Sequence, residues 1–72
     1  METIYCVVNI FSVEDGRKVK VTFDEPADVN VLNDISEYFR CQLDSLQLGT
    51  YEVCYNCNTS DIKIQRYISK AL

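Results

Sequence analysis

One stretch limits what this chain can fold into: residues 29–48, whose apolar side chains recur at steps of three or four. They are Val29, Leu32, Ile35, Phe39, Leu43 and Leu46. This spacing is typical of one face of an α-helix. The polar residues Asn33, Glu37, Arg40 and Asp44 fall on the opposite side of that helix. Because a lone apolar helix face must be buried, we predict a helix packed on a sheet formed by the segments before and after it.

The segment before the helix predicts a β-hairpin. Residues 3–13 are rich in β-branched and aromatic side chains and apolar on both faces, which is typical of a central strand. Asp15-Gly16 predicts a type I′ turn into a second strand over residues 17–24. Glu14 would then pair with Arg17. In that register the apolar sides of both strands share one face, with Ile10 opposite Val21 and Val8 opposite Phe23.

The segment after the helix predicts a second hairpin. Asp28 is a suitable N-cap for the helix, and Gly49, which follows Leu48, is its expected C-cap. Residues 50–57 alternate as a strand does, and residues 61–67 supply a partner strand. The tail leaves an alternative open, because some of its apolar residues also have helical spacing: Ile64, Tyr67, Ile68, Ala71 and Leu72.

This order of elements resembles the β-grasp family, in particular the small immunoglobulin-binding domains of bacterial proteins L and G. The likeness rests on the first strand ending in Asp15-Gly16, the capped helix from Asp28, and residues 49–53 opening the second hairpin. Residues 25–28 also resemble the corresponding stretch of ubiquitin. The resemblance implies one α+β domain over residues 1–72, of ββαββ order, with one helix packed across one face of the sheet. It further implies a four-stranded mixed sheet of order 2-1-4-3, in which the two terminal strands pair in parallel. No functional residue is carried over, because fold alone does not imply function.

Charge and composition narrow the function. The formal net charge is −4, which disfavours nucleic acid as a partner. The chain contains no histidine, the commonest general base, so we expect no enzymatic activity and no cofactor. No run approaches the ~20 apolar residues of a membrane span, and the first residues do not resemble a signal peptide. We therefore expect a cytoplasmic protein without a membrane partner.

Four cysteines provide an alternative function, in metal binding or redox chemistry. Cys54 and Cys57 have CxxC spacing, but one such pair is a weak metal signal. Residues three apart in a strand also face opposite sides of a sheet. We expect Cys6 to be buried under the helix and Cys41 to be exposed, so the sequence predicts no metal site.

The most informative surface is the side of the sheet that the helix does not cover. We expect this side to carry aromatic and apolar residues beside lysines: Tyr5, Val7, Phe11, Val13, Lys18, Lys20, Lys63, Gln65 and Tyr67. Exposed apolar area with a polar rim is typical of an interface. The alternative is that lysine stems shield these residues.

The sequence thus favours a small, non-enzymatic protein-interaction module. It would bind a foreign protein or a second copy of itself, as an inhibitor or adaptor of the kind that phages, plasmids and viruses encode. The same aromatic and basic residues also suit a third function, binding of single-stranded nucleic acid.

Overall fold

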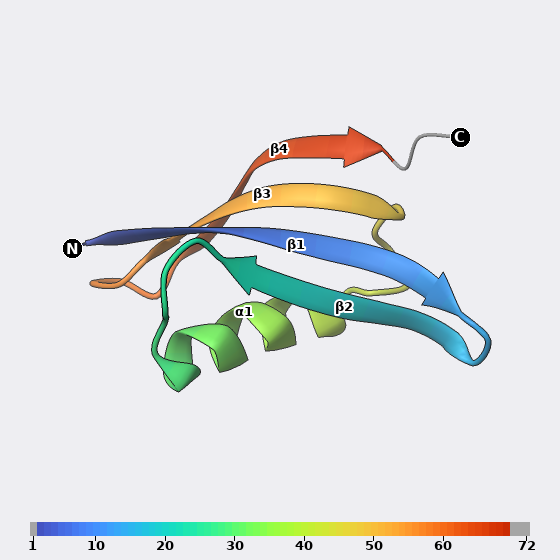
Figure 1. The fold of residues 1–72 in the computed structure, drawn as a ribbon, viewed down its shortest axis with the longest axis horizontal. Helices are drawn as coiled ribbons and strands as arrows, with labels where there is room; N and C mark the ends of the chain where they lie inside the picture. Colours follow the sequence, from blue (N-terminus) through green and yellow to red (C-terminus); the bar gives the residue numbers. More distant parts are fainter. Residues whose placement is uncertain (1, 70–72) are drawn as a thin grey trace.

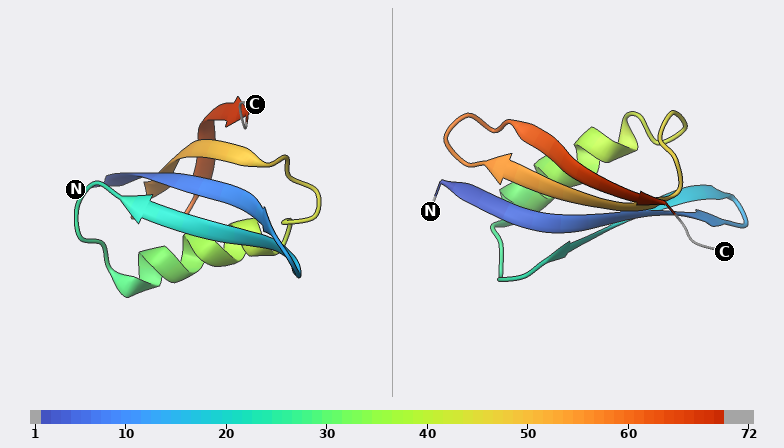
Figure 2. Two further views of the ribbon diagram at one scale, coloured as in Figure 1. Left: turned by 45° about the vertical axis from the view of Figure 1, so that its right-hand side comes forward. Right: turned by 90° about the horizontal axis from the view of Figure 1, so that it is seen from above.

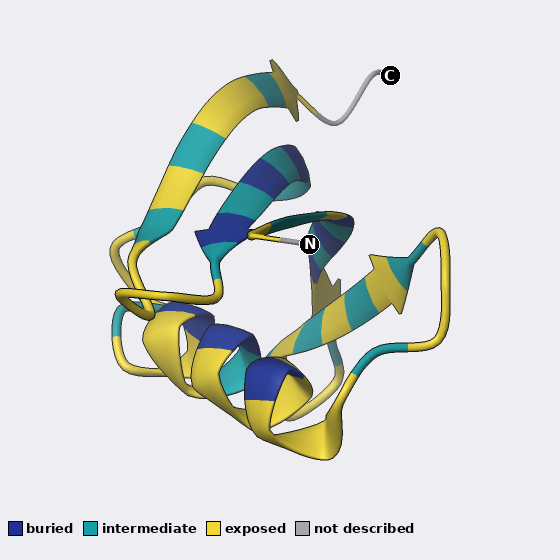
Figure 3. Cartoon of the chain, turned by 90° about the vertical axis from the view of Figure 1, so that its left-hand side faces the viewer, coloured by how far each residue is buried: buried dark blue, intermediate teal, exposed yellow. Residues whose placement is uncertain are grey.

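The computed structural model describes residues 2–69 and confirms the predicted order of elements. These are β1 (Thr3–Val13), β2 (Gly16–Phe23), α1 (Val29–Arg40), β3 (Gly49–Asn56) and β4 (Ile62–Ser69). The helix crosses one face of a four-stranded sheet (Figure 1). Its buried side is turned toward the strands, whereas its opposite side is exposed (Figure 3). We call the sheet face away from α1 the outer face.

The predicted sheet order is wrong. The strands lie in the order β2-β1-β3-β4, and every neighbouring pair is antiparallel. The mixed sheet of order 2-1-4-3, with parallel terminal strands, is therefore not found. The predicted central position of β1 is correct, but its second neighbour is β3 rather than β4.

The residues of the last two strands explain this order. Tyr51, Val53 and Tyr55 of β3 are at most 5% exposed, so β3 needs neighbours on both sides and the helix beneath it. In β4 the inward residues Ile62 and Ile64 are only half-buried, and the strand carries several polar side chains. Polar and charged side chains suit an edge strand, where unpaired backbone groups face solvent.

The core lies between α1 and the inward side of the sheet. It consists of Cys6, Val8, Ile10, Val31, Ile35, Phe39, Tyr51, Val53 and Tyr55. The helix thus buries residues at i, i+4 and i+8 from Val31. The predicted face was partly wrong, since Val29 is 63% exposed and Leu32 is 37% exposed. Ile35 and Phe39 belong to both the predicted and the observed buried face of the helix, and both are fully buried.

The helix is also shorter than predicted. Its N-cap is Asp28 as expected, and the Asp28 side chain accepts a hydrogen bond from the Asn30 amide at 2.8 Å. Its C-cap is Cys41 rather than the predicted Gly49. Gly49 instead starts β3. The segment between them forms successive turns, and its residues Leu43 and Leu46 still pack against the core.

A distant side chain helps to explain why the helix stops. The guanidinium Nη1 of Arg17, on β2, donates hydrogen bonds to the backbone carbonyls of Leu43, at 3.1 Å, and of Leu46. Carbonyls near the end of a helix lack intrahelical partners. Arg17 therefore stabilises a non-helical path across residues 41–48, where the apolar spacing alone predicted more helix.

The first hairpin keeps the predicted faces but not the predicted register. Val13 pairs with Gly16, so the two-residue loop is Glu14-Asp15 rather than Asp15-Gly16. Neither loop residue has a positive φ, whereas Gly16 has φ 138°, so the turn is not type I′. The shift is two residues, and strand faces alternate with period two. The apolar sides of β1 and β2 therefore still share one face.

The last element is the predicted strand, β4, which pairs with β3 over most of its length. Residues 70–72, which the helical alternative for the tail includes, lie outside the described residues. The one helix in residues 2–69 is too short to cross a membrane.

Candidate functional site

The middle of the outer face is an apolar row along β1. Tyr5 is 56% exposed and Phe11 is 36% exposed, while Val7 between them is half-buried. Alternation along β1 places these side chains opposite the buried Cys6, Val8 and Ile10. The predicted residues Tyr5, Val7, Phe11 and Val13 thus lie on one side of one central strand, as expected from the sequence.

Basic residues lie on both sides of this row. On β2, Lys18 pairs with Phe11 and Lys20 pairs with Asn9. The register predicted from an Asp15-Gly16 loop would place Lys20 beside Phe11 and Lys18 beside Val13, and the two-residue shift of the hairpin explains the difference. On β4, Lys63 follows Cys54 and Tyr5 along one row across the sheet. Directly paired residues share a face, so both lysine-bearing strands contribute to the outer face.

Tyr67, by contrast, was assigned to the wrong face. The β3–β4 register shifts between Glu52 and Val53, so Ile64 pairs with Val53 while Arg66 pairs with Glu52. This bulge inserts Gln65 and reverses the alternation beyond it. Tyr67 therefore turns inward, packs its ring 4.8 Å from that of Tyr51 and donates a hydrogen bond to the Leu48 carbonyl.

The bulge also brings two residues to the outer face that the sequence did not indicate. Arg66 pairs with Glu52, and Ile68, which is 42% exposed, pairs with Thr50. Strict alternation in β4 would have turned both inward. The Gln65-Arg66 pair of consecutive polar residues is the only sign of the bulge in the sequence.

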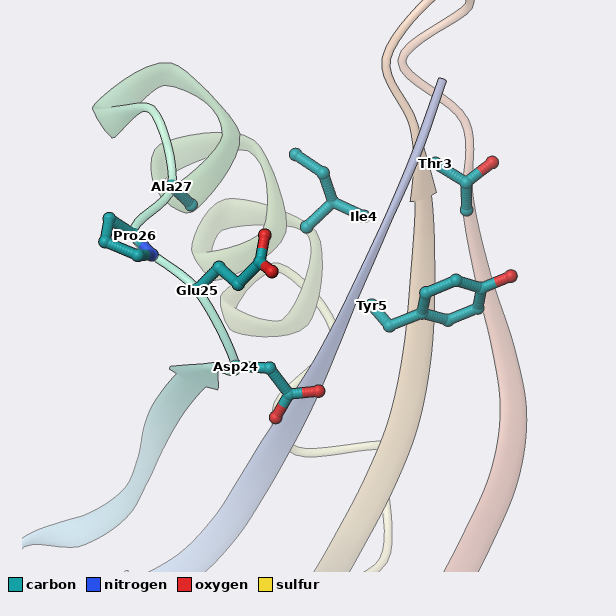
Figure 4. Close-up of a pocket in the computed structure, with 7 residues that line it drawn as sticks. All are labelled: Thr3, Ile4, Tyr5, Asp24, Glu25, Pro26 and Ala27. Carbon is teal, nitrogen blue, oxygen red and sulfur yellow. The ribbon is translucent and has the colours of Figure 1, made fainter. Parts of the chain in front are cut away.

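A hollow of about 360 Å³ opens beside the first residues of β1. β2 begins to pair with β1 only at Cys6, so the first residues of β1 have no strand beside them on that side. The chain from β2 to α1 borders this gap, and Figure 4 shows Tyr5 on one side of β1 and Ile4 on the other. The hollow is lined by Thr3, Ile4, Tyr5, Asp24, Glu25, Pro26 and Ala27. Tyr5 belongs both to the lining of this hollow and to the outer face.

The cysteines occupy four different environments. Cys6 is buried as predicted, and burial raises the pKa of its thiol to about 11. Cys41 is exposed as predicted, Cys57 is exposed, and Cys54 is half-buried on the outer face. The two cysteines of the CxxC spacing could converge only if the strand ended at Tyr55 and a turn began there. β3 continues to Asn56, so this turn is not formed. Within residues 2–69, no three Cys, Asp or Glu side chains are grouped as metal ligands would be.

The helix side of the molecule carries a buried tyrosine, Tyr55, that is hydrogen-bonded to α1. The Tyr55 hydroxyl donates a 2.6 Å hydrogen bond to the Asp34 carboxylate on α1, and this bond raises the pKa of Tyr55. Such a bond fixes the helix relative to β3. The neighbouring groove between α1 and the β3–β4 loop is lined partly by Glu37, Tyr38 and Cys41.

Comparison of the chain with protein-family models, with curated proteins and with solved structures finds no match.

Proposed function

We propose that this protein is a small, non-enzymatic interaction module that binds a protein partner through its outer face. The observation that carries the proposal is the exposure of Tyr5 and Phe11 on the central strand of a sheet whose other face is covered by α1. Burying an apolar side chain of this size is worth about 1.5–3 kcal/mol. A domain of this length has little stability to lose by leaving such residues in water.

The shape of the site supports binding to a protein rather than to a small molecule. Figure 2 shows the four strands as a continuous twisted layer with α1 on one side. The outer face is broad, and the hollow beside Tyr5 could accept one side chain of a partner. An inhibitor or adaptor works through such a surface by covering a site on its target.

Phe11→Lys tests this proposal. The substitution places a charge in the apolar row while leaving the core residues untouched, so the thermal midpoint should change little. Partners captured from the native host by immobilised wild-type protein should be lost. The matched control is Leu32→Lys on α1, because Leu32 is 37% exposed and Phe11 is 36% exposed.

The comparison between the two variants decides the outcome. Loss of the same captured proteins by Phe11→Lys, with retention by Leu32→Lys, supports the outer face as the binding site. If Phe11→Lys keeps every partner and every activity of the wild-type protein, the proposal is wrong.

A further inference from the structure

The net charge of −4 conceals an uneven distribution of charge over the molecule. On the outer face, the described basic residues are Lys18, Lys20, Lys63 and Arg66. Glu52 is the acidic residue of that face within the strands, and Asp24 lies at its edge, where it lines a hollow with Tyr5, Val7 and Glu52. The helix side has the opposite character. From its N-cap to its C-terminus, α1 carries Asp28, Asp34 and Glu37 against Arg40. The remaining acids of the described chain lie mostly in turns and connections, among them Glu14, Asp15, Glu25, Asp44 and Asp61.

The basic side chains form two rims around the apolar row. Lys18 and Lys20 are exposed on the edge strand β2, and Lys63 and Arg66 are exposed on the opposite edge strand β4. The row of Tyr5, Val7 and Phe11 runs between them on β1. Charged rims around an apolar centre steer a partner of opposite charge and fix its orientation.

We infer that the outer face binds an acidic protein surface, one that surrounds an apolar patch with carboxylates. This inference rests on the proposed function, since it names the chemistry of the partner at the same site. Carboxylates of the partner would meet the two basic rims, and its apolar side chains would cover Phe11 and Tyr5.

An interface of ordinary size would extend beyond the apolar row. A standard protein interface buries about 800 Å² on each partner, and the whole chain has 5197 Å² of accessible surface. The partly buried side chains of the row do not supply that area alone, so such an interface would include residues of the basic rims.

An acidic protein surface and single-stranded nucleic acid both carry negative charge, and the geometry of the outer face favours the protein. Tyr5 and Phe11 are six residues apart on one strand, a separation of about 20 Å. Successive bases need successive aromatic platforms. Between the two rings the strand presents Val7 and Asn9, and Asn9 accepts a 2.7 Å hydrogen bond from the Thr50 hydroxyl.

A second copy of this chain fits less well than a foreign partner. The acidic side of the molecule is α1, so charge complementarity would join the helix side of one copy to the outer face of the next. Such head-to-tail contacts leave a free face at each end and add further copies unless a ring closes. A foreign acidic surface satisfies the outer face without this consequence.

The test measures binding of labelled probes to the whole protein by fluorescence anisotropy, with amide chemical shifts locating the contact. The first probe is a peptide of leucine and glutamate whose apolar residues form one helix face. The second probe replaces its glutamates with lysines, and the third is oligothymidylate of similar length. We expect the acidic peptide to bind the outer face, and its affinity to fall as added salt shortens the screening length.

Charge reversal provides the matched comparison. Lys20→Glu and Arg40→Glu change the net charge by the same amount, one on the outer face and one on α1. Lys20→Glu should weaken the acidic peptide by about fivefold, as expected for a rim charge, and Arg40→Glu should change it much less. Equal effects of the two variants would overturn the inference, because they would reflect net charge alone.

The remaining outcomes separate the inference from the proposed function. Tighter binding of oligothymidylate than of the acidic peptide at the same salt would overturn the inference in favour of nucleic acid. Binding of the lysine peptide to the outer face, abolished by Phe11→Lys, would overturn the inference and leave the proposed function standing. A molecular mass that rises with concentration, and returns to that of a monomer in Lys20→Glu, would identify a second copy as the occupant instead. If no probe binds and Phe11→Lys keeps all native partners, both are wrong.

Discussion

Adding a single methyl group at Gly49 tests the position of β4 directly. Gly49 has φ 146°, a conformation that side chains disfavour. A Cβ placed there would lie 2.5 Å from the backbone oxygen of Ile68 and 2.9 Å from the Tyr67 ring. Gly16 provides the internal control, because it has a similar φ of 138° but no atom within 4 Å of an added Cβ.

The two glycines separate the cost of conformation from the cost of close approach. At Gly16, alanine should destabilise through its φ alone, which costs about 1–3 kcal/mol and is offset by about 0.4–1 kcal/mol from the less flexible unfolded chain. At Gly49 the same cost applies, and overpacking against β4 adds about 1–3 kcal/mol. Gly49→Ala should therefore lose about 2 kcal/mol more than Gly16→Ala. The total free energy of unfolding of a domain of this size is about 4–11 kcal/mol.

Urea unfolding followed by far-ultraviolet circular dichroism measures both free energies, with the slope of each transition checking that the unfolded states are comparable. Gly49→Ala should have a markedly lower midpoint than Gly16→Ala. Equal losses in the two variants would refute the reasoning, because they would mean that neither Ile68 nor Tyr67 lies against Gly49. The register of β3 with β4, and with it the inward position of Tyr67, would then be wrong.

Two further predictions concern the core and the thiols. Phe39→Ala should reduce the free energy of unfolding by about 3–5 kcal/mol in the same assay, because it leaves a cavity under the sheet. Asn33→Ala, on the exposed side of α1, should change the free energy of unfolding little. A wild-type midpoint for Phe39→Ala would contradict the orientation of the helix. In native protein, a thiol reagent should modify Cys41 and Cys57 first and Cys6 only on unfolding, as mass spectrometry of quenched samples would report. The pKa of Cys6 is raised by folding from 9.0 to about 11, so its contribution to stability is complete below about pH 9 and is lost as pH rises toward 11. Stability measured against pH should therefore fall more steeply over that range in wild-type protein than in a Cys6→Ala variant, and identical slopes would rule out burial of the thiol.

Much of the local structure followed from the sequence because its causes are local. The period of two in residues 3–13 fixed which side chains of β1 face the core, and apolar character on both sides placed β1 in the centre of the sheet. Asp28 caps α1 because its carboxylate lies next to the free amides of the first turn. The same period of two kept the outer-face assignment of Tyr5, Phe11 and Lys63 correct even where the register or strand order was not.

The tertiary structure decided the features that depend on residues far apart in the chain. The apolar spacing of residues 41–48 continues the helical pattern, but Arg17 on β2 bonds to carbonyls of this segment and favours turns instead. Arg17 is separated from Leu43 by 26 positions and from Leu46 by 29 positions, and no local signal in the sequence predicts contacts over such separations.

Strand order and charge distribution also depend on residues that are far apart in the chain. Whether β3 or β4 lies beside β1 depends on how completely each strand's inward side chains are buried, which only packing against α1 decides. The bulge at Gln65 is set by pairing between β3 and β4, and it alone exchanged Tyr67 for Arg66 and Ile68 on the outer face. The sequence determined a net charge of −4, but only the folded sheet separates basic residues from acidic ones, because a surface brings together side chains that the chain keeps apart.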